Sequence, residues 1–399
     1  MSNKAKWNYT GVVISDIHFG AIDAEQLKEE LMEEFIYHLS RMNKIDFIII
    51  DGDYFDHKLY MNESSSRYAI EIMDEIVEIG MRDNSPIRIV YGTESHEVSQ
   101  YNIFSVYENN PDLDFKVIRT VQEEELLKDL NVLYIPEEFV YEKKEYYKDY
   151  FNNDNKYDYI FGHGVINEVM TQASRNLSKK DTNRKKVPVF TTSELSKICK
   201  GQVYFGHYHI NTNIDDKIFY VGSFTRWQHG EEEEKGFYEL ECDVKSEKYS
   251  NKFIVNTLAK KYCTRTFSYT DMNIDTQEEL YKMLNTTEKL CEINDIENVR
   301  YIFNIPEDHP NPEFLIKVLN ERYKFNDKVK LQITNGYVDK QRKINKEKLN
   351  ESLSEYPMIF DKSYPLEDKL VYFIKKKWDR DIDTEKVKKY LWKIMITNF

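Results

Sequence analysis

The sequence is poor in cysteine and lacks long apolar runs. Its four cysteines, Cys199, Cys242, Cys263 and Cys291, are scattered without a C-x-x-C pair, which is typical of reduced thiols rather than of a disulfide framework. No apolar run approaches the length of a membrane span, and residues 1–7 lack the apolar stretch of a signal peptide. We therefore expect a cytoplasmic protein that does not bind a membrane.

An excess of positive charge is also missing. The 399 residues include 56 Lys and Arg against 70 Asp and Glu, for a net charge of −14. Such a chain repels nucleic acid in general, so any contact with DNA would need a local basic patch. Internal repeats and low-complexity linkers are absent too, and the length accommodates two or three globular domains.

The most informative stretch follows an apolar run. Residues 47–50 (Phe-Ile-Ile-Ile) predict a buried strand, and Asp51, Asp53, Asp56 and His57 come directly after it. In α/β proteins, ligand and catalytic groups collect where strands end. Crowded carboxylates repel one another unless a cation neutralises them, so this strand end predicts a metal site.

Other apolar runs end in the same way. Predicted strands at 11–15, 87–91, 157–161 and 202–205 are each followed by an acidic residue or histidine, namely Asp16 with His18, His96, His163, and His207 with His209. Helical patterns at 24–42, capped by Asp23, and at 66–80 separate the first three strands, which indicates a mostly parallel βαβ start. Further strands are expected near 115–119, 132–135, 217–221, 236–243 and 252–255, with a helix near 142–151.

The ordered pattern D-x-H, G-D-x-x-D, H-[DE], G-H and G-H-x-H, over about residues 10–225, resembles the calcineurin-like metallophosphoesterase superfamily. The resemblance implies an α/β fold, a four-layer α/β/β/α sandwich with two divalent metal ions at the strand ends. One ion would be held by Asp16, His18 and His209, and the other by His163 and His207, with Asp53 as the bridge. His96 would assist the leaving group, while the two metals activate a hydroxide that attacks the phosphoester.

The third motif departs from the family pattern G-N-H-[DE], in which the Asn is a ligand of the second metal. Here residues 92–97 read G-T-E-S-H-E, with Ser95 before His96. Ser95, a water or Glu94 would have to fill that position, and the second metal would bind more weakly. A metallophosphoesterase-fold scaffold that has lost turnover is therefore one alternative.

Within the superfamily, the chain resembles the SbcD-type nuclease subunit of bacterial and phage recombination complexes. The similar segments are residues 16–20 (D-I-H-F-G) and 220–226 (Y-V-G-S-F-T-R). This resemblance implies a DNA exonuclease and endonuclease that acts on single- or double-stranded DNA in repair and recombination. It also implies a bacterial protein, or a phage protein in the host cytoplasm, with an SbcC-type coiled-coil ATPase as its partner and dimerisation as a family expectation. The ligand types suit Mn²⁺, Fe²⁺ or Zn²⁺, and Mn²⁺ is the family expectation.

A phosphomonoesterase or small-molecule phosphodiesterase is the other enzymatic alternative. It is less expected, because the chain continues well beyond the phosphoesterase motifs. We predict a nuclease domain at 1–257, a small α+β accessory domain at 258–345 and a helical C-terminal tail at 346–399 that packs on its own domain or on the partner.

Two basic segments leave two interpretations open. The first lies between the histidine loops and includes Arg175, Lys179, Lys180, Arg184, Lys185 and Lys186. The second runs over residues 340–348. Each is either a solvated loop or a contact for DNA phosphates.

Overall fold

The structure is a computed structural model. It describes residues 7–335 except 98, 153, 155, 170–185, 269, 273, 275, 294–295, 297, 307–308, 325 and 327, and in addition residues 368–369 and 371–372. The chain divides into two compact units, one of Met1–Thr264 with Lys289–Val299 and one of Arg265–Glu288 with Arg300–Phe399. The three-part division drawn from the sequence stays a prediction, since most of the tail at 346–399 lies outside the described residues.

The first sheet of the first unit has the strand order β14-β13-β1-β2-β3-β4. Its strands are β1 (Tyr9–Ile14), β2 (Phe47–Asp51), β3 (Ile87–Val90), β4 (Phe115–Ile118), β13 (Gly236–Asp243) and β14 (Lys248–Val255). Strands β1 to β4 are parallel neighbours, whereas β13 pairs antiparallel with both β1 and β14. The parallel βαβ start predicted from the sequence is therefore confirmed.

The second sheet has the order β11-β12-β10-β7-β6-β5. Its strands are β5 (Gln122–Leu127), β6 (Leu130–Ile135), β7 (Tyr157–His163), β10 (Cys199–Gly206), β11 (Thr212–Asp215) and β12 (Ile218–Tyr220). Its centre, β6-β7-β10-β12, is parallel, and the outer strands β5 and β11 are antiparallel to their neighbours. A separate pair, β8 (Val165–Ile166) and β9 (Val189–Phe190), is also parallel.

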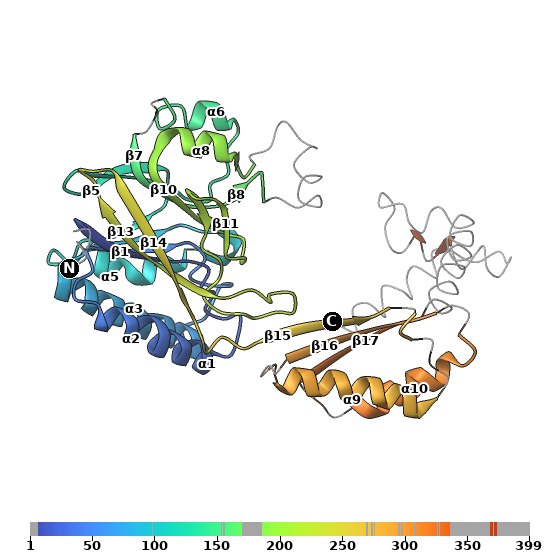
Figure 1. Cartoon of the computed structure of the whole chain (residues 1–399). Coiled ribbons are helices and arrows are strands. Elements are labelled where there is room, and N and C mark those ends of the chain that lie inside the picture. Colours follow the sequence, from blue (N-terminus) through green and yellow to red (C-terminus); the bar gives the residue numbers. More distant parts are fainter. Residues whose placement is uncertain are drawn as a thin grey trace. The chain divides into compact units, whose positions relative to one another are not determined.

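Helices cover the outer faces of both sheets (Figure 1). The first sheet packs against α1 (Ala24–Glu30), η1 (Leu31–Ile36), α2 (Tyr37–Arg41) and α3 (Ser64–Asp83) through one apolar cluster. The second sheet packs against α8 (Thr192–Ile198), and against Tyr147 directly after α6 (Lys143–Tyr146), through another. Short α4 (Glu94–Glu97), η2 (Gln100–Phe104) and α5 (Ser105–Glu108) connect β3 to β4.

A third apolar cluster fills the space between the two sheets. Val13 and Ile49 of the first sheet and Tyr159, Phe161 and Tyr204 of the second belong to it, and all five are fully buried. Alternate residues of a strand face opposite sides, so neighbours such as Val12 and Val13 enter different clusters. The four-layer α/β/β/α sandwich expected from the sequence is therefore present.

Two predicted helices differ from the observed ones. The helix expected at 24–42 begins after Asp23, whose carboxylate accepts the N–H of Gln26, but its middle turn is a π-helix. The helix expected at 142–151 is only α6, four residues long, followed by turns. Tyr147, directly after α6, still packs inward, with its ring centroid 5.2 Å from that of Phe190.

Beyond the sandwich, the chain forms a smaller α+β arrangement. A three-stranded sheet has the order β15-β16-β17, with β15 (Tyr262–Phe267), β16 (Asn298–Ile305) and β17 (Val329–Asn335). The helices are α9 (Gln277–Ile293) and α10 (Pro312–Tyr323), joined by an ion pair of 2.6 Å between Arg322 and Glu288. The segment contains strands and helices as an α+β domain does, and the domain bounds drawn from the sequence stay a prediction.

Candidate metal centre

The strand ends of the two sheets bring the predicted ligands together. Asp16 and His18 follow β1, Asp53 follows β2, His163 is the last residue of β7, and His207 and His209 follow β10. Asp16, His18, Asp53 and His163 are almost fully buried. Their ligand-type atoms fall into overlapping groups in which all atoms lie within 4.8 Å of one another.

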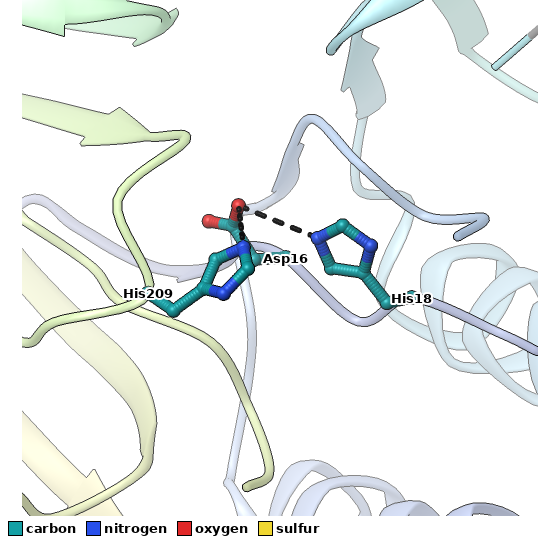
Figure 2. Close-up of side chains that lie close together, drawn as sticks. All are labelled: Asp16, His18 and His209. Atoms are coloured by element: carbon teal, nitrogen blue, oxygen red, sulfur yellow. Dashed lines mark ion pairs between the residues drawn. The ribbon is translucent and has the colours of Figure 1, made fainter. Parts of the chain in front are cut away.

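The first group is Asp16, His18 and His209. Figure 2 shows both imidazole rings turned toward one carboxylate, with His18 Nε2 3.7 Å and His209 Nε2 3.8 Å from Asp16 Oδ1. These separations exceed a hydrogen bond and leave room for a shared cation. The group has the composition that the sequence assigned to the first metal.

Asp53 lies between this group and the rest of the centre. Its Oδ2 is 3.6 Å from His18 Nε2 and 3.2 Å from His163 Nε2. Asp53 belongs to one group with His18 and to another with Asp16 and His163. This central position is what a bridging carboxylate requires, and the bridging role itself stays a prediction.

The backbone at the centre is held in unusual conformations. Asp16, His18, Asp53 and His207 all have positive φ, between 46° and 98°. A non-glycine residue in this region is strained, and such strain gathers at functional sites. Position 52 requires glycine for two reasons. Its φ is 85°, and a Cβ there would collide with the His163 ring.

The ionisable side chains of the centre shift one another's pKa values. Burial alone would lower the pKa of His18, but contacts with Asp16 and Asp56 raise it to about 9. Burial alone would raise the pKa of Asp16, but His18 and the charges of His163 and His209 lower it to about 2. Carboxylates and imidazoles that compensate each other in this way favour positive charge between them, carried by a proton or by a metal ion.

The buried donor atoms fit metal ions better than protons. His163 Nδ1 lies 2.9 Å from the backbone carbonyl of Asp51, and a carbonyl only accepts, so Nδ1 carries the hydrogen. The Nε2 of His163 is then free to present its lone pair, and it has no hydrogen-bond partner among the described residues. Both nitrogens of His18 are buried without a hydrogen-bond partner as well. Buried polar atoms of this kind call for a ligand, and mixed imidazole and carboxylate donors suit divalent transition metals.

Partners behind the ligands fix the orientation of the rings. Asp56 Oδ1 lies 3.4 Å from His18 Nδ1, and the Asp51 carbonyl holds His163. Glu231 Oε1 lies 3.6 Å from His209 Nδ1. Glu231 was not found from the sequence, because it lies in an acidic run, residues 231–234, that reads as a solvated surface.

A second residue that the sequence did not single out is Glu137. It forms a group with His163 and His207, and its Oε2 lies 3.0 Å from His207 Nδ1. Glu137 follows the end of β6, but the adjacent Glu138 made the pair look like ordinary loop acids. Only its burial distinguishes it.

The third motif lies at the rim of the centre in α4. His96 Nδ1 is 3.0 Å from Asp53 Oδ2, and the His96 side chain is 31% exposed, so it can meet both the centre and a bound substrate. Ser95 and Glu94 are exposed. Glu97 is fully buried and accepts the N–H of Tyr54 at 3.0 Å, which supports the Asp53 loop. The roles given to His96 and Ser95 stay predictions.

The basic segments are largely outside the described residues. In the first segment, the residues outside the described part of the chain are Arg175, Lys179, Lys180, Arg184 and Lys185. The second segment, residues 340–348, lies outside it as well. Lys186 is described, and its backbone exchanges two hydrogen bonds with Val140. The proposed phosphate contacts of these residues stay predictions.

Buried carboxylates and imidazoles gathered at the strand ends of a two-sheet sandwich define a metal-dependent hydrolase. The family model of the calcineurin-like phosphoesterases matches residues 11–211, half of the chain and all of the predicted ligands. The chain therefore belongs to the calcineurin-like phosphoesterase family, and metal-dependent hydrolysis of phosphoesters is its class of chemistry. A search of curated proteins returned no match. Among the described residues, no helix is both long and apolar enough to cross a bilayer.

Proposed function

We propose that this protein is an SbcD-type nuclease subunit, a Mn²⁺-dependent exonuclease and endonuclease for single- or double-stranded DNA. It would work with an SbcC-type coiled-coil ATPase in DNA repair and recombination. Fe²⁺ and Zn²⁺ are the alternative metals. The smaller α+β unit and the tail would serve DNA capping and docking of the ATPase.

The observation that carries the proposal is the location of the SbcD-like segment, residues 220–226. The Tyr220 hydroxyl donates to the carbonyl of Gly164 at 2.9 Å and accepts the N–H of Ile166 at 2.8 Å, which ties the segment to the loop after His163. The N–H of Ser223 donates to the carbonyl of His209 at 3.3 Å. The segment that resembles the nuclease branch therefore supports two predicted ligands.

Arg226 fastens the end of this segment. Its Nε donates to the carbonyl of Glu233 at 3.0 Å, and its Nη1 donates to the carbonyl of Ala259 at 3.1 Å. The next residue, Trp227, lies against the rings of His18 and His209 at centroid distances of 4.5 and 4.3 Å. The SbcD-like segment thus also positions an aromatic ring beside the first metal group.

Each group at the centre has a chemical task in phosphodiester hydrolysis. Bound divalent ions would neutralise the phosphodiester and lower the pKa of a water. Asp16, Asp53 and the buried histidines would hold these ions, and Trp227 would shield one side of the first group from water. His96, the most exposed of the histidines that meet at the centre, would protonate the departing sugar oxygen.

The test uses the purified full chain with Mn²⁺, with and without a matching SbcC-type ATPase. We expect cleavage of end-labelled single- and double-stranded DNA that stops when the metal is chelated. A panel of p-nitrophenyl phosphate and bis-p-nitrophenyl phosphate measures the alternative activities in parallel. DNA left intact beside rapid hydrolysis of the small esters would identify a small-molecule phosphoesterase instead. Absence of both turnover and bound metal would identify a scaffold.

A further inference from the structure

Glu137 is a buried carboxylate next to the second half of the metal centre. Its side chain is 3% exposed, and its backbone N–H donates to the carbonyl of Tyr91 at 3.1 Å, which fixes the loop after β6. Its Oε2 lies 3.0 Å from His207 Nδ1 and 3.2 Å from the Thr93 hydroxyl. The carboxylate is therefore held in place before any ligand binds.

No Lys or Arg among the described residues pairs with this carboxylate within 4.0 Å. Two other carboxylates of the same unit show the contrast. The buried Asp158 pairs with Lys200 at 3.0 Å, and the half-buried Glu124 pairs with Arg88 at 2.8 Å. The ionisable group that faces Glu137 among the described residues is a histidine, His207. A buried charge that is not compensated costs several kcal/mol, so a cation bound beside Glu137 would stabilise this position.

Thr93 brings a second negative group close to Glu137. The Thr93 hydroxyl lies 3.2 Å from Glu137 Oε2 and 3.2 Å from Asp53 Oδ2. The hydroxyl has one hydrogen and can donate to only one of the two carboxylates at a time. Two carboxylates this close repel each other, which again favours a cation between them.

His163 gives an independent indication that this place binds a cation. Its side chain is fully buried, and its Nε2 has no hydrogen-bond donor among the described residues while it faces Asp53 Oδ2 at 3.2 Å. A lone pair that faces a carboxylate is repelled unless a positive charge lies between them. Glu137, His163 and His207 each place one ligand-type atom within 4.8 Å of the others.

We infer that Glu137 is a direct ligand of the second metal ion, together with His163, His207 and the bridging Asp53. The carboxylate supplies the oxygen ligand for which the sequence offered only the exposed Ser95 and Glu94. It also makes the second site one charge more negative than a hydroxyl or a water would. More oxygen and more negative charge favour Mn²⁺ over softer ions at this position. The inference rests on the two-metal centre of the proposed function, but not on DNA as the substrate.

The test measures metal binding rather than cleavage. The metal-free full chain is titrated with Mn²⁺ by calorimetry, and spin coupling between two bound ions is followed by electron paramagnetic resonance. We expect two equivalents for the wild type. Glu137→Gln should retain the first equivalent, bind the second at least about tenfold more weakly and lose the coupled signal. Glu137→Asp keeps the charge on a shorter side chain and should restore part of the second affinity.

Glu138→Gln is the matched control, since Glu138 is the next residue but accepts hydrogen bonds from the N–H of Val121 and the hydroxyl of Tyr146 instead. It should bind both ions as the wild type does. Thermal unfolding of the metal-free proteins shows whether each variant folds, and Glu137→Gln should be at least as stable as the wild type because it removes a buried charge that no Lys or Arg among the described residues neutralises. Glu137→Gln with two wild-type affinities, or a wild type that binds only one ion, would overturn the inference. Two coupled ions without DNA cleavage would overturn the proposed nuclease and leave Glu137 as a ligand.

Discussion

His163 Nε2 lies 3.2 Å from Asp53 Oδ2, and the two residues come from different sheets of the sandwich. The Nδ1 of the same ring is held by the Asp51 carbonyl, so the ring cannot turn away. Both sheets must therefore be correctly packed before the centre exists. Metal binding can therefore be used to measure whether the two sheets are correctly packed.

Asp53→Asn should disrupt both metal positions. The substitution removes the charge shared by His18 and His163 and leaves an amide, whose N–H₂ group is repelled by cations. We expect Mn²⁺ affinity to fall at least about 100-fold for both equivalents, with loss of phosphoester hydrolysis. Calorimetric titration of metal-free protein measures this change. The exposed Asp112→Asn serves as the control, and retention of both equivalents in Asp53→Asn would exclude the bridge.

His96→Ala should separate catalysis from metal binding. His96 contacts Asp53 but lies at the rim, and its predicted task is proton transfer to the leaving group. We expect a loss of about 10²- to 10⁴-fold in the rate of hydrolysis with both Mn²⁺ equivalents retained. Rates on a diester and metal stoichiometry are measured on the same preparation. Loss of one metal ion would instead make His96 a ligand, since it also forms a group with His18 and Asp53.

Glu231→Gln should weaken the first metal position without removing a ligand. Glu231 lies 3.6 Å from His209 Nδ1, accepts the N–H of Trp227 at 3.2 Å and pairs with the buried Lys235 at 3.5 Å. The variant loses the charge that orients His209, so we expect about 10- to 100-fold lower affinity for one Mn²⁺ equivalent. Exposed Glu234→Gln should leave the affinity unchanged. Equal affinities in the two variants would show that Glu231 acts only in folding.

Acid should destabilise the sandwich through an ion pair between its two sheets, Arg88 with Glu124. Arg88 of β3 is 1% exposed and binds Glu124 of β5 through two contacts of 2.8 Å, which joins the two sheets. Partial burial alone would raise the pKa of Glu124, but the hydrogen bonds and charge of Arg88 lower it to about 2. A lowered pKa stabilises the folded state above the unfolded value of about 4.5. This stabilisation is lost as the pH falls from about 4.5 to about 2.

The measurement is urea unfolding of wild type and Glu124→Gln between pH 7 and pH 2.5. We expect the variant to be less stable by on the order of 3 kcal/mol near pH 7, and the difference to shrink toward zero below pH 3. A difference that stays constant over this range would show that charge is not the cause. The exposed Glu125→Gln, on the same strand, provides the control.

Most of the fold and most of the centre could be predicted from the sequence. Apolar runs that end in Asp or His gave the parallel strands and six of the buried or half-buried side chains at their ends, because parallel strands place their carboxyl ends along one edge. Strand β5 was not predicted, since half of its sequence, Q-E-E-E-L-L, is acidic. It forms because its partner β6 is strongly apolar and because Arg88 pairs with Glu124.

The sequence by itself determined the family and the predicted ligands Asp16, His18, Asp53, His163, His207 and His209, because each lies at or shortly after the end of a recognisable apolar run. The tertiary structure alone decided which of the 70 acidic residues support them. Glu137 and Glu231 lie in loops with no pattern, and folding buries them beside His207 and His209. Acidic side chains are ordinary on a surface and costly inside, so burial is what distinguishes these two, and burial is a property of the packed sheets.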